Sequence, residues 1–334
     1  FLFLNNDTVV TPNFISSMIE VMELDRTIGI CQSLLLKPDE SIDSSGDFID
    51  KLGVVYNSKT KINSQNYSSQ ILEVFNNNSY AQLAYDNQIT YQDNKPYPHI
   101  VLEDFLPIDI ANIVSGEYPN LSKGAEDYRF HNHEYASRYF LEDTTKFSTN
   151  LKLFSSAISS RSFLLFLETL TGIKSLIPDP YFLGGGAMIT NRGGYLNVHV
   201  DFNWHQKLQA WRRCNVLFYL TQDWKEEYEG KLELWSTDGK KKVKEITPLF
   251  NRVVIFNTTS NSFHGQPAPV LCPIEKPRHV FSAFYYASER DEETEDLPHY
   301  TRYQKDIRDN KAEFKDSPYA SGISKDYLKD IVKK

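Results

Sequence analysis

The sequence feature that most constrains the fold is a series of short runs between Gly194 and Tyr286 in which apolar and polar residues alternate. Such alternation is typical of β-strands with one buried face. Gly, Asn, Asp and Pro residues separate the runs, as they do in turns. Short strands at this spacing favour a β-sandwich or barrel over a parallel α/β sheet. We expect strands at residues 195–202, 215–220, 231–235, 252–256 and 278–286.

The remaining sequence divides the chain into further parts. Residues 1–58 carry strand, helix and strand patterns, and Thr11-Pro12 provides a helix start. Residues 59–96 are rich in Asn, Ser, Gln and Tyr without periodicity, which indicates a polar linker. A buried helix is expected at 159–170, ended by Gly172. The expected parts are an α/β fragment (1–58), a linker (59–96), a mainly β domain with flanking helices (97–288) and a charged C-terminal extension (289–334).

Charge and cysteine content limit the partners and the compartment. The 334 residues include 44 acidic and 36 basic side chains, and the net charge of -8 opposes binding to nucleic acid or to an anionic membrane. No stretch approaches the roughly 20 apolar residues of a membrane span. The three cysteines lack a Cys-x-x-Cys pair, so a reducing, cytoplasmic compartment is expected. The chain begins inside an apolar strand pattern without methionine, and we expect upstream sequence to be missing.

His199 and Asp201 are the first candidates for chemistry. Residues two apart on a strand point to one face, so both side chains can bind the same ion. Tyr195 and Asn197 share this polar face, which we expect to line a cavity, while the alternating apolar residues pack on the other face. With 8 histidines and 44 acids, about one His-x-acid pair arises by chance, so the surrounding sequence has to decide.

Two later residues complete a candidate iron site. His264 follows the apolar strand at 252–256 and supplies a third ligand. Two histidines and one carboxylate form an open facial triad for Fe(II), with free positions for substrate chemistry. Arg278 begins an otherwise apolar and aromatic strand, where a buried guanidinium needs an anion such as a carboxylate.

Each of these residues also has a purely structural explanation. The alternatives are a surface pair at a sandwich edge for His199 and Asp201, a loop histidine for His264, an ion pair with an internal acid for Arg278, and a core position for Tyr195. Other apparent sites carry less weight. These are His131-Asn132-His133-Glu134 in an expected solvated loop, His205 off the register of the triad, and Gly184-Gly185-Gly186, which we expect to relieve crowding beside a strand.

Residues from about 97 to 288 resemble the Fe(II)- and 2-oxoglutarate-dependent dioxygenases, particularly the prolyl-4-hydroxylase-like branch. The family pattern is His-x-Asp, a distal His and then a basic residue, as at His199, Asp201, His264 and Arg278. Further similar elements are Tyr219-Leu220, Asp223-Trp224, residues 230–235 and residues 248–256. Two positions depart from the family, which often has Gly-Gly where Glu229-Gly230 stands, and Ser where Val280 stands. Ser282 shares the face of Arg278 instead.

This resemblance implies a double-stranded β-helix, or jelly roll, in which His199, Asp201 and His264 bind Fe(II). It also implies that 2-oxoglutarate binds the iron, with Arg278 holding its far carboxylate and Tyr195 assisting. The implied reaction consumes O2, decarboxylates 2-oxoglutarate to succinate and hydroxylates a prime substrate, with ascorbate as a candidate reductant. A glycan, a nucleotide sugar and a prolyl side chain all remain open as that substrate.

Residues 1 to about 55 resemble the middle of family 2 glycosyltransferases. The similar elements are Leu4-Asn5-Asn6-Asp7-Thr8, Pro12-Asn13-Phe14, residues 29–36 and Ser45-Gly46. The resemblance implies that Asn5 and Asp7 correspond to the element that binds the metal and diphosphate of a nucleotide sugar. The rest of that fold is missing, so no transferase activity is expected. A second hypothesis is therefore a glycosyltransferase fragment whose jelly-roll part is a non-catalytic binding module.

Overall fold

The computed structural model describes residues 35–36, 42–44, 47–49, 55–57, 67–119, 126–289, 297–304 and 314–316. The chain forms two compact units, Phe1–Asn66 and Tyr67–Lys334. In the first unit, β1 (Leu35–Leu36) pairs with β2 (Ile42–Ser44) and β3 (Asp47–Ile49) pairs with β4 (Val55–Asn57), both antiparallel. The glycosyltransferase-like motif with Asn5 and Asp7 lies outside the described residues.

The second unit is built on an antiparallel sheet that forms two four-stranded layers. One layer has the order β9-β17-β12-β15 and the other the order β14-β13-β16-β10, while β7 pairs with both β9 and β10. The first layer contains β9 (Gly186–Thr190), β17 (Arg278–Ala287), β12 (Ala210–Tyr219) and β15 (Val253–Asn257). The second contains β14 (Lys242–Ile246), β13 (Leu232–Trp235), β16 (His264–Gln266) and β10 (Tyr195–Val200). Most consecutive strands alternate between the layers, which is consistent with a jelly roll.

Short strands extend both layers. They are β5 (His99–Leu102) beside β15, β6 (Arg129–His133) beside β7 (Ala136–Leu141), β8 (Ile177–Pro178) beside β17, β11 (Trp204–His205) beside β12, and β18 (Arg302–Gln304) between β10 and β19 (Phe314–Asp316). All five strands expected between residues 195 and 286 are present, and their bounds differ from the expected ones by at most five residues. The expectation of a mainly β fold with flanking helices is confirmed for this unit.

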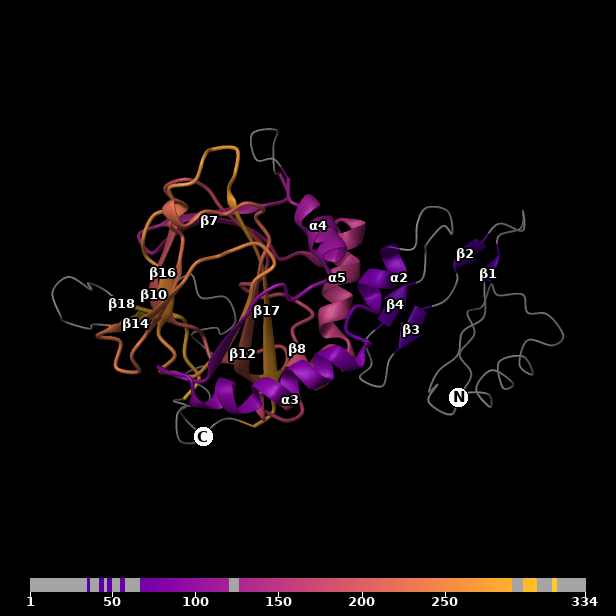
Figure 1. Cartoon of the computed structure of the whole chain (residues 1–334), viewed down its shortest axis with the longest axis horizontal. Coiled ribbons are helices and arrows are strands. Elements are labelled where there is room, and N and C mark those ends of the chain that lie inside the picture. The colour runs from indigo at the N-terminus through magenta and orange to yellow at the C-terminus, as the bar shows by residue number, and fades with distance from the viewer. Residues whose placement is uncertain are drawn as a thin grey trace. The chain divides into compact units, whose positions relative to one another are not determined.

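Five α-helices of the described residues pack on the outer face of the first layer and share one apolar core with it. They are α2 (Tyr67–Leu72), α3 (Asn78–Asp93), α4 (Ile108–Gly116), α5 (Thr149–Ser159) and α6 (Arg161–Thr171), and short 3-10 turns form at η2 (Thr144–Lys146) and η3 (Glu226–Tyr228). Figure 1 shows α4 and α5 on one side of β12 and β17, with β10 and β16 on the other. Phe154 of α5 packs edge-on against Phe218 and Phe281 of these strands. None of the helices in the described ranges is long and apolar enough to cross a membrane.

The predicted linker at 59–96 is wrong for its second half. Helices α2 and α3 occupy residues 67–93, and the compact units divide before Tyr67. In α3, Tyr80, Ala84 and Tyr91 are buried on one face, while most of the other residues are polar and face solvent. The sequence did not indicate this helix, because only three of its sixteen residues are buried and most of the others are polar.

Local signals explain where the better predicted helix begins and ends. The Ser160 side chain accepts a hydrogen bond from the Phe163 backbone N–H and caps the start of α6. Gly172 follows the helix with a φ of 74°, the left-handed conformation that glycine adopts at helix ends. The helix expected at 159–170 is therefore confirmed. It packs on the outer face of the layer that contains Arg278.

Candidate active site

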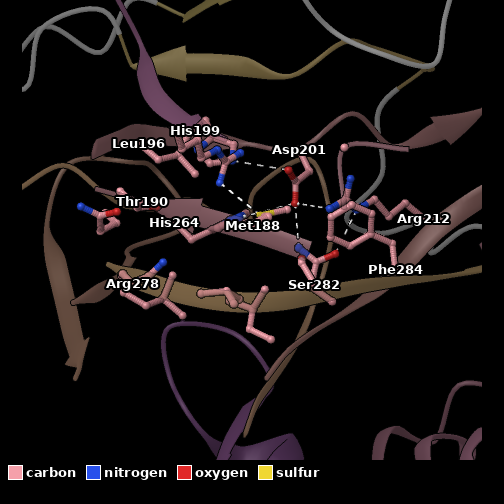
Figure 2. A pocket seen from close by; sticks show the side chains of 18 residues that line it. Met188, Thr190, Leu196, His199, Asp201, Arg212, His264, Arg278, Ser282 and Phe284 are labelled. Atoms are coloured by element: carbon pink, nitrogen blue, oxygen red, sulfur yellow. Dashed lines mark hydrogen bonds and ion pairs between the residues drawn. The ribbon is translucent and has the colours of Figure 1, made fainter. Parts of the chain in front are cut away.

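His199, Asp201 and His264 converge at the second layer. His199 of β10 lies directly opposite His264 of β16 in the antiparallel pair. The Nε2 atom of His199 is 3.4 Å from Oδ1 of Asp201, and that of His264 is 3.5 Å from Oδ2. Figure 2 shows the two imidazoles and the carboxylate pointing toward one another. Within the described parts of the chain, they are the only group of three His, Cys, Asp or Glu placed to hold a metal ion.

The hydrogen bonds of both histidines leave Nε2 available to a metal. Nδ1 of His199 is 2.7 Å from the carbonyl oxygen of Asn197, and Nδ1 of His264 is 2.9 Å from that of Ser262. A carbonyl only accepts, so Nδ1 carries the proton and the neutral ring keeps a lone pair on Nε2. Burial lowers the pKa of His264 to about 4, so its imidazole is neutral at physiological pH.

Asp201 is held by two side chains from β12. Its Oδ2 forms an ion pair with Nη2 of Arg212 at 2.9 Å and accepts a hydrogen bond from Nδ2 of Asn215 at 2.8 Å. Arg212 also donates from Nε to Oδ1 of Asn215 at 3.0 Å, and its guanidinium carbon lies 3.5 Å from the ring centre of Phe284. Burial alone would raise the pKa of Asp201, but Arg212 and the two histidines hold it well below its usual range. The carboxylate is therefore ionised.

Arg278 lies in the same pocket, at the start of β17. Its guanidinium carbon is 5.1 Å from the ring centre of Tyr219, and burial lowers its pKa. Its buried Nε has no hydrogen-bond partner, and no acid of the described residues forms an ion pair with it. Gly230 leaves room for the side chain, because a Cβ there would lie 3.1 Å from Cδ of Arg278. A buried guanidinium without an acidic partner is suited to an anion from outside the protein.

The expected role of Tyr195 disagrees with the structure. Tyr195 does not line the pocket, and its hydroxyl donates to the carbonyl oxygen of His133 at 3.2 Å. The register of β10 against β16 shifts between Leu196 and His199, so strict alternation fails there. As a result Leu196, and not Tyr195 or Asn197, lines the pocket together with His199.

Several pocket residues were missed by the sequence analysis. Arg138 of β7 and Arg212 and Asn215 of β12 all line the pocket. Arg212 and Asn215 point to the same side although they are three apart, because the β12 register shifts between Arg212 and Cys214. In the sequence, Arg138 and Arg212 look like exposed strand residues. The register shift that turns Arg212 into the pocket has no local sequence signal.

The C-terminal extension predicted at 289–334 also contributes to the site. Tyr303 of β18 lies opposite His199 of β10, and their ring centres are 5.2 Å apart. The Tyr303 ring stacks on Tyr135 at 4.5 Å and is buried. Residues 297–304 are thus part of the domain, although they follow a charged segment. The aromatic residues Tyr300 and Tyr303 within that charged sequence were the available signal.

None of the weaker sequence candidates joins the metal-ligand group, although Gly184 lines the same pocket. His131 and His133 belong to strand β6 and not to the expected loop. His205 is buried, with Nε2 3.5 Å from Oδ1 of Asp179. A Cβ at Gly185 would lie 2.7 Å from the carbonyl oxygen of Ser282, and a Cβ at Gly186 would collide with that of Leu141. Gly185 and Gly186 therefore relieve crowding beside neighbouring strands, as expected.

This fold and site define a class, that of enzymes in which a β-sheet jelly roll holds a metal with two histidines and one carboxylate. Residues 185–286 match the family model described as the 2OG-Fe(II) oxygenase superfamily. The chain therefore carries an oxygenase domain of this superfamily and is an enzyme whose cofactors are Fe(II) and 2-oxoglutarate. No curated protein matches the chain in sequence.

Solved structures with a similar fold include prolyl hydroxylases. A prolyl hydroxylase from Trichoplax adhaerens is 15% identical, with a TM-score of 0.45, and the match covers 67% of this chain and 94% of that one. A prolyl-4-hydroxylase from Pseudomonas putida is 14% identical, with a TM-score of 0.45 and coverage of 61% and 99%. HygX from Streptomyces hygroscopicus, bound to nickel, 2-oxoglutarate and hygromycin B, is 12% identical, with a TM-score of 0.41 and coverage of 60% and 86%. Likenesses at this level identify no substrate.

Proposed function

We propose that the chain is a 2-oxoglutarate-dependent hydroxylase in which His199, Asp201 and His264 bind Fe(II). The observation that carries this proposal is the convergence of both Nε2 atoms on the Asp201 carboxylate, beside a buried arginine without an acidic partner. Two imidazoles with Nε2 turned toward an ionised aspartate match the ligand set that Fe(II) takes in non-heme oxygenases. The site lies between the two layers, where strands β9, β12, β13 and β17 also line the pocket.

Arg278 is proposed to bind the far carboxylate of 2-oxoglutarate. Its planar guanidinium can donate two parallel hydrogen bonds to a carboxylate, and its Nε has no competing acceptor. Thr190 lies directly opposite Arg278 across β9 and β17 and also lines the pocket, so its hydroxyl is a second candidate donor. Thr190 takes the assisting place that the sequence assigned to Tyr195.

When bound, Fe(II) and 2-oxoglutarate supply the O2-dependent oxidation, in which 2-oxoglutarate becomes succinate and the prime substrate is hydroxylated. The residues of this chain hold and orient the reactants. Arg212 and Asn215 fix the Asp201 carboxylate, and apolar side chains of the pocket wall, such as Leu217 and Val280, exclude water beside it. The prime substrate stays open among a glycan, a nucleotide sugar and a prolyl side chain. The alternative of a non-catalytic binding module has no supporting observation, since its motif lies outside the described residues.

The test is an anaerobic titration of Fe(II) and then 2-oxoglutarate, followed by the weak visible charge-transfer band of an oxo acid bound to ferrous iron. We expect a band that is absent in His199→Ala and needs more 2-oxoglutarate in Arg278→Met. On admission of O2 with ascorbate, succinate should form even without a prime substrate. A folded protein that gives neither the band nor succinate contradicts the proposed function.

A further inference from the structure

The pocket contains more positive charge than the proposed cofactors use. Three arginines line it, Arg138, Arg212 and Arg278, and Asp201 is the only acidic residue among the lining residues. Arg212 forms an ion pair with Asp201 at 2.9 Å. In the proposed function, one carboxylate of 2-oxoglutarate binds the metal and the other binds Arg278. Arg138 is therefore left over, in a chain whose net charge is -8.

Arg138 lies where β7 passes from one layer to the other. Its neighbours Ala136 and Ser137 pair with β10, while Tyr139 and Phe140 pair with β9. Its Nη1 is 3.7 Å from Sδ of Met188. Its guanidinium carbon is 4.4 Å from the ring centre of Phe140. These contacts hold the side chain in the pocket by packing and leave its hydrogen-bonding edge largely unused.

The nearby acids already have other partners. Glu142 binds Arg129 at 2.9 Å, and Asp201 binds Arg212. Among the described residues no acid forms an ion pair with Arg138, and its buried Nε has no hydrogen-bond partner. Burial lowers the pKa of Arg138 to about 10, so the group stays charged at neutral pH. A charge held in this way costs free energy of folding, and an anionic ligand offsets that cost.

We propose that Arg138 binds an anionic group of the prime substrate, either a carboxylate or a phosphate monoester. This inference rests on the proposed function, because it assigns to the substrate the anion that the cofactors leave unbound. The guanidinium fork binds both kinds of oxyanion through two parallel hydrogen bonds. Arg138 acts electrostatically on Tyr303, whose ring lies against that of His199, and on Asp201. An anion bound there would place the substrate next to the metal ligands.

The test uses the full chain with Fe(II) and 2-oxoglutarate under anaerobic conditions, titrated by calorimetry with acetate or with methyl phosphate. We expect one of the two anions to bind, and Arg138→Met to weaken its affinity by about tenfold or more, as for the loss of a charge-assisted pair. The charge-transfer band should persist in this variant at the same 2-oxoglutarate concentration. Arg161→Met is the matched control, because Arg161 lies on α6 and pairs with Glu168. The affinity of the Arg161→Met protein for both anions should equal that of the unsubstituted protein.

Two further results would overturn the inference. Equal anion affinity in Arg138→Met and in the unsubstituted protein shows that Arg138 is no anion site. A loss of 2-oxoglutarate affinity in Arg138→Met equal to that in Arg278→Met assigns Arg138 to the cofactor. Absence of the band in the unsubstituted protein counts against the proposed function instead. In that case the anion titrations are repeated on the protein without Fe(II) and 2-oxoglutarate. Anion affinity that is lost in Arg138→Met still supports the anion site, and the absence of such affinity rejects the site.

Stability provides an independent readout. If Arg138 is kept for binding, Arg138→Met removes an unpaired, largely desolvated charge and should raise the melting temperature of the ligand-free protein by roughly 2–4 °C. A purely structural arginine, held for its contacts with Phe140 and Met188, should instead give a lower melting temperature when replaced. Arg138→Lys keeps the charge but not the fork, so its anion affinity should lie between those of Arg138→Met and the unsubstituted protein.

Discussion

Nη2 of Arg212 lies 2.9 Å from Oδ2 of Asp201, so the proposed carboxylate ligand of the metal is also half of a largely buried ion pair. This contact turns Oδ1 toward His199, whose Nε2 is 3.4 Å away. Asp201 follows the end of β10, where strand pairing alone does not fix a side chain. The orientation of the carboxylate therefore depends on β12, which is adjacent to β15 and β17 in the other layer.

Replacing Arg212 with Met should weaken Fe(II) binding by about 10- to 100-fold, as for other residues that orient a metal ligand. Without the guanidinium, burial raises the pKa of Asp201, so protonation competes with the metal at a higher pH than in the unsubstituted protein. The measurement is the Fe(II) dissociation constant between pH 5 and 8, with folding checked by near-UV circular dichroism. The control is Arg213→Met, because Arg213 donates to the carbonyl oxygen of Glu289 and does not line the pocket. Identical pH profiles for both variants would contradict a positioning role for Arg212.

Acid should destabilise the metal-free protein through His279. This residue faces the helices, stacks on Tyr118 at 4.4 Å, and has a pKa that burial lowers to about 4. Between pH 6.5 and about 4, the unfolded chain takes up a proton that folded His279 does not, so the free energy of unfolding falls as the pH falls. The loss reaches at most about 3 kcal/mol near pH 4.

Urea unfolding of the metal-free protein at pH 7 and at pH 5 tests this expectation. In His279→Phe the difference between the two pH values should shrink, because the ring can still stack on Tyr118 but no longer titrates. The comparison variant is His133→Phe, whose imidazole is less buried and should contribute less. An unchanged pH dependence in His279→Phe would show that His279 titrates equally in the folded and unfolded states.

Glu229 occupies a backbone conformation that suits glycine. Its φ of 56° and ψ of -137° are unfavourable for a residue with a Cβ. The dioxygenase family that the sequence resembles often has Gly at this position. Glu229→Gly should therefore raise the free energy of unfolding by about 1 kcal/mol. The control is Glu227→Gly within the 3-10 turn η3, which should be neutral or destabilising. Chemical denaturation of both variants measures the difference, and a less stable Glu229→Gly would point to an unrecognised role of the Glu229 side chain.

The sequence predicted the part of the site that depends on residue type and strand period. His199 and Asp201 alternate with apolar residues, His264 follows an apolar strand and Arg278 begins one, and the structure brings all four into one pocket. Tyr195 was misplaced because alternation fails at a register shift. The pairing of distant strands determines the rest.

Arg138 enters the pocket only because β7 pairs with both β9 and β10, and Arg212 only because β12 has an irregularity. Neither relationship leaves a mark in the local sequence. The helices at residues 67–93 were missed for a related reason, since their polar composition hides a narrow buried face that only the neighbouring helices and sheet define.

Tyr303 tests whether the C-terminal segment is part of the enzyme. Its ring fills the space between Tyr135 and His199, so Tyr303→Ala should remove packing on both and lower the free energy of unfolding by about 3 kcal/mol. Loss of this support should also let His199 move, and Fe(II) should dissociate faster. Tyr303→Phe is the matched control, because it keeps the ring and should keep both properties close to those of the unsubstituted protein. Stopped-flow chelation of bound Fe(II) and urea unfolding provide the two readouts. If Tyr303→Ala loses stability but not iron, the segment supports the fold alone, whereas coupled losses place Tyr303 among the residues that position His199.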